Sequence, residues 1–391
     1  MKITIPTLLL VLLFNLSGFA QANIGLNWGG TKAKDYYEEI PYESVNGKLF
    51  ITVSFQHRKA KFLFDTGAPT QISPDLAEEL NCNIIDKVNV TDANGSSDTI
   101  KIALLKEIGL NQVVFNDLHV LLTNPDMYKC WGAEGVVGSN MLHTSILHID
   151  AAKHLLILTD DLDKLHLRKE NAVSMISNKG PQSQPYLALK FNGKEVPLIG
   201  FDTGDSDFFI ISKPYMSYLA QKNDFQKMAT GYGSVGHSLF GLQKQDTTYR
   251  IKIPAIQLGN HTFTNVITES NNKSSTRLGS KILDYGNVTL DFKHHKFYFE
   301  ADSTVLNLDE KRWPVALTAV DNKVAVVLVW DKPNVKLQPG EEVTAIDDTP
   351  YESFSFCQLL NSKPLLFGKE KALLTVKNAQ GVVRKVTIIK E

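Results

Sequence analysis

The sequence has only three cysteines among its 391 residues, Cys82, Cys130 and Cys357. So few cysteines exclude a small scaffold that depends on a dense set of disulfides. Two alternatives remain open for these thiols. Either Cys82 and Cys130 form a disulfide that leaves Cys357 free, or all three are buried thiols.

An excess of charge is also missing, because 41 basic and 42 acidic side chains give a net charge of -1. This balance gives no support for nucleic acid or an anionic membrane surface as a partner. Hydrophobic residues make up 43% of the chain and charged residues 21%, which is typical of a globular protein with sizeable cores. The length predicts two or three domains.

Long apolar runs are scarce, and the one at the amino end covers residues 3–16. It follows a single Lys2 and leads into Ala20-Gln21-Ala22, which predicts a signal peptide over residues 1–22, cleaved near Ala22. No later segment has the length and apolar character of a membrane span, so no membrane anchor is expected. We expect an exported protein, either periplasmic or secreted.

What the chain does contain is a repeated tetrapeptide, Phe64-Asp65-Thr66-Gly67 and Phe201-Asp202-Thr203-Gly204, 137 residues apart. Two carboxyl groups a few Å apart cannot both ionise, so they share one proton and can activate a water molecule. A chain with two matching half-sites can supply one aspartate from each.

More of the sequence repeats around the tetrapeptides. Gly138 follows Asp65 by 73 residues, and Gly279 follows Asp202 by 77 residues. The motifs Ser73-Pro74 and Ser212-Lys213-Pro214 each predict a short helix. The chain therefore contains an internal repeat of about 120 residues.

Both copies of the repeat are rich in short β-strand patterns. Strands are expected over 48–55 and 61–64 in the first copy, and over 186–191 and 196–201 in the second. The second pair surrounds Asn192-Gly193, a strong hairpin signal. In each copy the triplet directly follows the second strand of the hairpin. The polar stretch up to Pro185 favours a connection between the copies.

Beyond the repeat, residues 313–391 favour a small separate unit. Its most informative phrase is Pro339-Gly340-Glu341-Glu342-Val343. A helix is expected over 351–360, followed by strands over 371–377 and 382–389.

The doubled Asp-Thr-Gly with its downstream glycine elements resembles the aspartic proteases of the pepsin and retroviral-protease type. The carboxyl-terminal unit resembles a PDZ domain. The resemblance implies a mostly β, bilobal acid-protease fold of two retropepsin-like lobes plus a small α+β PDZ-like domain. The expected divisions are the signal peptide 1–22, lobe one 23–165, an inter-lobe connection 166–185, lobe two 186–305 and the PDZ-like domain 313–391.

The resemblance also implies a role for each motif residue. Asp65 and Asp202 would be the catalytic pair that activates water for peptide hydrolysis without a covalent intermediate. The remaining motif residues would support the two active-site loops: Thr66, Gly67, Thr203, Gly204, Gly138 and Gly279. One chain would supply both aspartates, so dimerisation is not required for the site.

Proteases of this kind cover the substrate with a flap, and each copy offers a candidate. These are Asn94 and Gly95 in the first copy, and Tyr232 and Gly233 in the second. Residues 231–236 also match the Gly-x-Gly-x-x-Gly pattern of nucleotide-binding loops. No convincing helix follows that segment, so the flap interpretation is favoured.

Two residues depart from the family pattern. Asp205 follows the second triplet. It either points inward and raises the pKa of Asp202 by like-charge repulsion, or faces outward and caps a turn; the outward position is favoured. Arg277 stands where an apolar residue is usual, and we expect an outward-facing edge position. The histidines at 143, 148, 154, 294 and 295 match no compact metal-ligand spacing, so neither a metal nor another cofactor is expected.

These observations favour an aspartic endopeptidase with a peptide or protein substrate. The alternative is a catalytically inactive peptide-binding protein that uses the cleft and the PDZ-like tail. The tail would bind a peptide ligand or regulate the enzyme by docking on the cleft.

Overall fold

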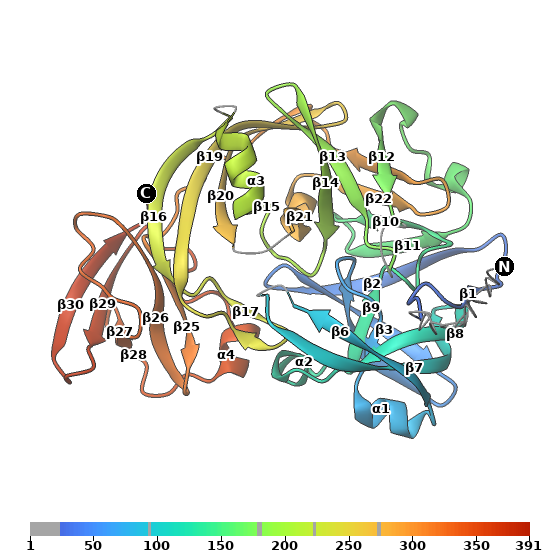
Figure 1. Ribbon diagram of the computed structural model, residues 1–391, viewed down its shortest axis with the longest axis horizontal. Coiled ribbons are helices and arrows are strands. Elements are labelled where there is room, and N and C mark those ends of the chain that lie inside the picture. The colour runs from blue at the N-terminus through green and yellow to red at the C-terminus, as the bar shows by residue number, and fades with distance from the viewer. Residues whose placement is uncertain (1–23, 93–94, 178–181, 222–223, 272–274) are drawn as a thin grey trace, which may run out of the picture.

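The computed structural model describes residues 24–92, 95–177, 182–221, 224–271 and 275–391. The predicted signal peptide and its cleavage site lie outside these ranges. Most of the described chain is β-strand, with four short helices among β1 to β30, so the expected mostly β class is confirmed (Figure 1). Within these ranges, no helix has both the length and the apolar character needed to cross a membrane.

The first copy of the repeat is organised around a hairpin of β3 (Lys48–Phe55) and β4 (Arg58–Asp65). Strand β9 (Gly135–Gly138) lies parallel to β4, and its register places Gly138 opposite Asp65. The second copy has the same arrangement. Strands β13 (Tyr186–Phe191) and β14 (Lys194–Asp202) form the hairpin, and β21 (Arg277–Gly279) places Gly279 opposite Asp202.

The predicted turn and helix signals are confirmed in both copies. Asn192 and Gly193 have φ angles of 47° and 77°, as a two-residue hairpin turn requires. The hydroxyl oxygens of Ser73 and Ser212 cap α1 (Pro74–Glu79) and α3 (Lys213–Ala220) by accepting a backbone N–H.

A six-stranded antiparallel sheet joins the two copies. Its order is β2 (Tyr37–Val45), β11 (Leu155–Thr159), β10 (Ile146–Asp150), β22 (Asn287–Asp291), β23 (Lys296–Glu300) and β12 (Ala172–Ile176). Strand β12 therefore lies inside the segment predicted as a connection, 166–185. It holds the position in the second copy that β2 holds in the first, and its five residues were too short a pattern to detect.

Longer strands complete each copy. The first contains β6 (Asn83–Thr91), β7 (Ser97–Leu110) and β8 (Val113–Leu122), and the second contains β16 (Gln226–Gly233), β19 (Asp246–Leu258) and β20 (His261–Asn271). The remaining short elements are β1 (Gly30–Thr31), β5 (Gln71–Ile72), β15 (Phe209–Ser212), β17 (His237–Ser238), β18 (Gly241–Leu242), β24 (Val305–Asn307), β28 (Thr349–Pro350), η1 (Leu162–Leu165), η2 (Lys169–Asn171) and η3 (Ser280–Asp284).

The carboxyl-terminal residues have their own hydrophobic cluster, which includes Val324, Val343 and Leu374. Its strands are β25 (Val315–Val320), β26 (Lys323–Trp330), β27 (Glu342–Ile346), β29 (Lys371–Lys377) and β30 (Val383–Ile389), and its helix is α4 (Phe356–Asn361). The two predicted strands are confirmed, whereas the helix is shorter than expected because Ser355 caps it.

The tail is joined to the second copy by a shared sheet. Strand β26 pairs with β16, with Trp330 opposite Gly231 and Leu328 opposite Gly233. The Arg250 guanidinium lies 4.1 Å from the centre of the Trp330 ring and adds a cation–π contact at this junction.

The disulfide joins Cys130 to Cys357, and Cys82 is free, so both sequence-based alternatives are wrong. Cys130 lies on α2 (Asp126–Trp131), which packs against α4 of the tail (Figure 1). The two half-cystines are 227 residues apart. Their pairing depends on where the tail docks, which no local pattern encodes.

Candidate active site

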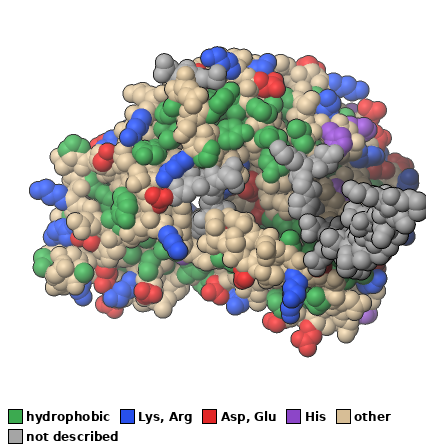
Figure 2. Space-filling model, viewed as in Figure 1, with side chains coloured by type: hydrophobic (Ala, Val, Ile, Leu, Met, Phe, Trp, Pro, Cys, Tyr) green, Lys and Arg blue, Asp and Glu red, His purple; other side chains and the backbone are tan. Residues whose placement is uncertain are grey.

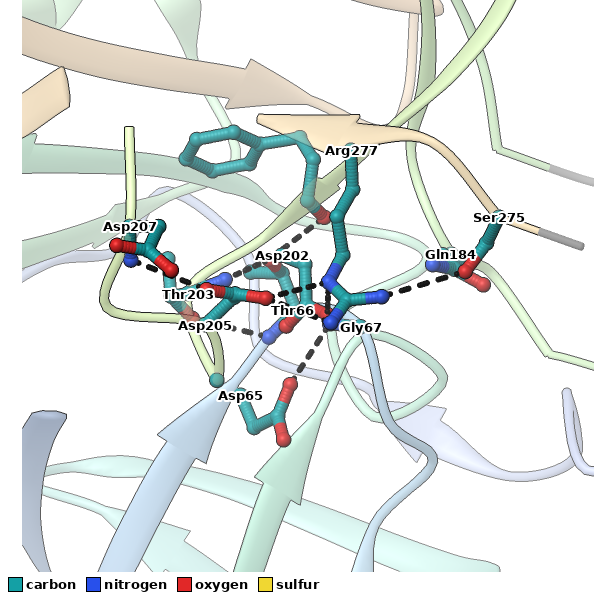
Figure 3. A network of polar contacts seen from close by, with 12 residues as sticks. Asp65, Thr66, Gly67, Gln184, Asp202, Thr203, Asp205, Asp207, Ser275 and Arg277 are labelled. Carbon is teal, nitrogen blue, oxygen red and sulfur yellow. Dashed lines mark hydrogen bonds and ion pairs between the residues drawn. The ribbon is translucent and has the colours of Figure 1, made fainter. Parts of the chain in front are cut away.

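The two Asp-Thr-Gly triplets meet through four buried hydrogen bonds that are reciprocal (Figure 3). The backbone N–H of Thr66 donates to Oγ1 of Thr203, and that of Thr203 donates to Oγ1 of Thr66, both at 3.0 Å. Each hydroxyl donates in turn across the junction, from Thr66 to the Phe201 carbonyl at 3.0 Å and from Thr203 to the Phe64 carbonyl at 3.1 Å. The triplets are thus fixed to each other.

The glycines of the triplets bring the two carboxyl groups together. A Cβ atom on Gly67 would lie 2.3 Å from Cγ of Asp202, and one on Gly204 would lie 2.2 Å from Oδ2 of Asp65. Each carboxyl group therefore packs directly against the glycine of the other triplet, where no side chain fits. The Gly67 N–H also donates to Oδ1 of Asp65 at 2.8 Å.

Gly138 and Gly279 pack against the backbone of the loops that follow Asp65 and Asp202. Added Cβ atoms would lie 2.3 Å from the Ala68 carbonyl oxygen and 2.1 Å from the Asp207 carbonyl oxygen, respectively. All eight residues predicted for the pair and its support are therefore brought to one place.

Removing one threonine hydroxyl tests this junction. We expect Thr66→Val to lower the free energy of unfolding by about 2–4 kcal/mol, because it leaves a buried N–H and a buried carbonyl without partners. Urea denaturation would measure the change. Thr52→Val is the matched control, since Thr52 is exposed on β3. Equal stability of the two variants would contradict the structural role of the hydrogen bonds.

Asp65 and Asp202 line a cavity of about 860 Å³. Figure 2 shows this face of the molecule hollowed near its centre, with acidic side chains visible inside the hollow. Two hairpins contribute to the lining of the cavity. Residues 88–92 come from the first copy and residues 235–239 from the second. The backbone N–H of Phe240 donates to Oδ2 of Asp92 at 3.1 Å, so the two hairpins contact each other.

The flap candidates lie in different kinds of structure in the two copies. Asn94 lies outside the described residues, while Gly95 sits in the β6–β7 turn with a φ of 80°. Tyr232 and Gly233 lie within β16, paired with both β19 and β26, because the tail extends this sheet. The cavity-lining part of that hairpin is residues 235–239, which directly follows the predicted pair and overlaps the end of the candidate flap segment 231–237.

The expected outward positions of Asp205 and Arg277 are wrong. Arg277 is 7% exposed, and its Nε lies 2.6 Å from Oδ2 of Asp205 and 3.3 Å from Oδ2 of Asp202 (Figure 3). Its Nη2 also lies 2.6 Å from the Asp205 carboxylate. An ion pair thus lies beside Asp202, because β14 and β15, the strands on either side of the loop that contains Asp205, both pair with β21, which begins at Arg277.

The two copies of the repeat differ at the positions that form the ion pair. In the first copy, the positions of Asp205 and Arg277 are held by Ala68 and Val136, which pack in one apolar cluster. The second copy replaces that apolar contact with an ion pair. The signal was present in the sequence, since both departures from the pattern fall in the same copy, but it requires reading the two positions together.

The pKa values of Asp65 and Asp205 are shifted in opposite directions by their surroundings. Burial, the negative charge of Asp202 and a hydrogen bond with its carboxyl group raise the pKa of Asp65 to about 8. For Asp205, burial would raise the pKa, but the charges of Arg277 and Lys48 outweigh it and hold the pKa of Asp205 below its usual value. Lys48, which sequence reasoning missed, also lines the cavity and donates to the Gly204 carbonyl.

The raised pKa of Asp65 predicts how stability depends on pH. Folded Asp65 keeps its proton up to about pH 8, whereas the unfolded chain releases it near the ordinary value of 3.8. The folded state therefore binds more protons in this window, so its stability falls as pH rises from about 4 to about 8. Asp65→Asn removes this loss, and the variant's melting temperature should increasingly exceed that of the wild type across the window. A constant difference in melting temperature across the window would contradict the shift, and the exposed Asp302→Asn variant is the control.

The other candidate residues fit structural roles. The His148 ring nitrogen lies 2.8 Å from the Thr289 hydroxyl, within the sheet that joins the copies. No group of three or more possible metal ligands occurs among the residues that the structure describes. Tyr128 and Trp131 are buried in a cluster with Phe50 and also line the cavity.

Comparison with known proteins adds one match within the first copy. Residues 51–144 match the family model described as "gag-polyprotein putative aspartyl protease". No curated protein matches the chain. The solved structure of conglutin gamma, a basic 7S globulin from lupine seeds, matches with 10% identity and a TM-score of 0.38, covering 69% of this chain and 96% of that one. That likeness is too weak to carry an argument. The matched segment contains Asp65 and Gly138, so the first copy of the repeat is similar to an aspartyl protease domain.

Proposed function

We propose that this protein is an exported aspartic endopeptidase in which Asp65 and Asp202 together activate a water molecule. The observation that carries the proposal is the reciprocal packing of the two triplets, in which each glycine contacts the carboxyl group of the other copy. The aspartyl-protease match of residues 51–144 supports it independently.

The surroundings of the pair suggest a role for each aspartate. Asp202, beside Arg277, would carry the negative charge and accept a proton from water. At the same time, the water oxygen would bond to the scissile carbonyl carbon. Asp65 would give its proton to the carbonyl oxygen, forming a tetrahedral gem-diol. When the C–N bond breaks, the proton on Asp202 passes to the leaving nitrogen, and a gem-diol hydroxyl returns a proton to Asp65.

Three further proposals concern the protein's setting. The chain supplies both aspartates, so the site would be complete in a monomer. The amino-terminal pattern supports export, and so does the Cys130–Cys357 disulfide, because disulfides persist mainly in oxidising compartments. The substrate would be a peptide or an unfolded protein segment that enters the cavity.

The experiment uses the chain from Asn23 onward with unfolded protein substrates between pH 3 and 8. Mass spectrometry should detect new peptide termini, with one oxygen from ¹⁸O-labelled water in each new carboxylate. Added hydroxylamine should yield no hydroxamate, because no acyl-enzyme forms. Hydroxamate products, or a chain that cuts nothing under any condition, would contradict the proposal.

An inactive peptide-binding protein is the alternative function. The observation that favours this alternative is the position of the Arg277 guanidinium. It lies close enough to Asp202 to compete with a water molecule for the carboxyl group. Peptides that bind the full chain and are never cut would decide for this alternative. A carboxyl-terminal peptide ligand for the tail stays a prediction.

A further inference from the structure

One wall of the cavity comes from the tail. Phe356, Leu359 and Leu360 of α4 line the same cavity as Asp65 and Asp202. Thr318 of β25 lines it as well. A unit that could have been attached by a flexible linker instead forms part of the space in which a substrate would lie.

Helix α4 is fixed in this position by contacts with the first copy. The Cys130–Cys357 disulfide joins it to α2. The Asn46 side-chain amide donates to the carbonyls of Leu360 and Ser362 at 2.9 and 2.8 Å, and the Asn361 amide donates to the Cys130 carbonyl at 2.9 Å. Phe356 and Leu359 also pack against the tail's own hydrophobic cluster, so α4 is held between the tail and the first copy.

The wall has the chemistry of an apolar subsite with a few polar atoms. Its three α4 side chains are only half-buried, and Met127 and Trp131 of α2 line the cavity close by. Trp131 is only 8% exposed, and its Nε1 atom is buried without a hydrogen-bond partner among the described residues. The His237 ring, from the hairpin of the second copy, lies 4.4 Å from the Phe356 ring. Half-exposed apolar carbon on the wall of a cavity suits a large apolar side chain of a peptide.

We propose that α4 of the tail is a specificity wall of the substrate cleft, which receives a large apolar side chain of the peptide and is fixed by the Cys130–Cys357 disulfide. This inference rests on the proposed peptide hydrolysis. It gives the tail a part in substrate selection that neither a separate ligand-binding module nor a detached regulator would have.

Reversing the character of the wall tests the inference. Leu359→Glu should lower kcat/KM at least about tenfold for peptides with Leu or Phe at one substrate position, and raise it for peptides with Lys or Arg there. Preferences at the other positions should not change. The matched control is Phe367→Glu, because Phe367 is a 63% exposed apolar residue of the same tail that does not line the cavity. Identical preferences in both variants would overturn the proposal.

Opening the disulfide tests how the wall is held. Cys357→Ala should broaden the preference at that same position, whereas Cys82→Ala, which removes the free thiol, should not. Reducing the wild-type disulfide with dithiothreitol and then reoxidising it should reproduce the change and its reversal without any mutation. An unchanged preference after complete reduction would overturn the role of the disulfide.

A binding measurement separates failure of this inference from failure of the proposed hydrolysis. A peptide with a photoreactive leucine and a non-cleavable scissile bond is irradiated with Asp65→Asn protein, and the crosslinked residues are identified. Crosslinks within 356–360 support the wall even if the chain cuts nothing. Crosslinks confined to other parts of the cavity, or none at all, overturn the wall even if the chain is an active protease.

Discussion

Replacing Asp65 or Asp202 by asparagine is expected to lower kcat/KM for peptide cleavage by about 10²- to 10⁴-fold. An amide can neither accept a proton from water nor give one to the scissile carbonyl oxygen. Because the two groups act as one unit, the double variant should be about as inactive as either single variant. Purified variants would be assayed with one fluorogenic peptide across pH 3–8.

Asparagine is nearly the same size as aspartate, so the hydrogen bonds between Thr66 and Thr203 should survive. Melting temperatures would verify that each variant is folded. Asp302→Asn is the matched control, since Asp302 is exposed and remote from the cavity. Retention of more than about a tenth of the activity in either active-site variant would mean that the pair is not the catalytic unit.

The second large effect is expected from Arg277→Val, which removes the cation and leaves Asp205 buried without its partner. Breaking a buried ion pair costs about 3–5 kcal/mol, and the side chains of Arg277 and Asp205 are only 8% and 10% exposed. The uncompensated charge of Asp205 also opposes the negative charge of the Asp65–Asp202 pair. The acid limb of the pH–activity profile, where the pair takes up its second proton, should therefore move to higher pH.

The first copy of the repeat supplies the matched control. The double variant Asp205→Ala/Arg277→Val recreates the apolar contact that Ala68 and Val136 make. It should recover most of the lost stability, because an apolar pair can replace a buried ion pair. Its acid limb should lie between those of the wild type and the single variant. If Arg277→Val is as stable as the wild type and has the same pH profile, the ion pair does not influence the site.

Sequence patterns succeeded where the signal is local. The hairpins that lead to Asp65 and Asp202 were predicted from alternating apolar residues and a turn dipeptide, both of which act within a few residues. The caps at Ser73 and Ser212 were predicted for the same reason, since a cap acts on its own first turn. The repeat extended this local information, because a pattern seen twice is hard to ascribe to chance.

Local sequence patterns could not predict contacts between residues that are far apart in the chain. Nothing near Cys130 indicates Cys357, and nothing near β16 indicates that β26 extends its sheet. Asp205 and Arg277 each depart from the family pattern, but they form an ion pair only because β14 and β15, the strands that flank the Asp205 loop, both pair with β21.

By itself, the sequence determined that two similar halves each end a strand in Asp-Thr-Gly, because strand period and turn chemistry are properties of neighbouring residues. Only the tertiary structure decided which side chains surround those aspartates. Ion pairs, disulfides and cleft walls join residues that are far apart in the chain, and docking of whole elements determines which of them meet.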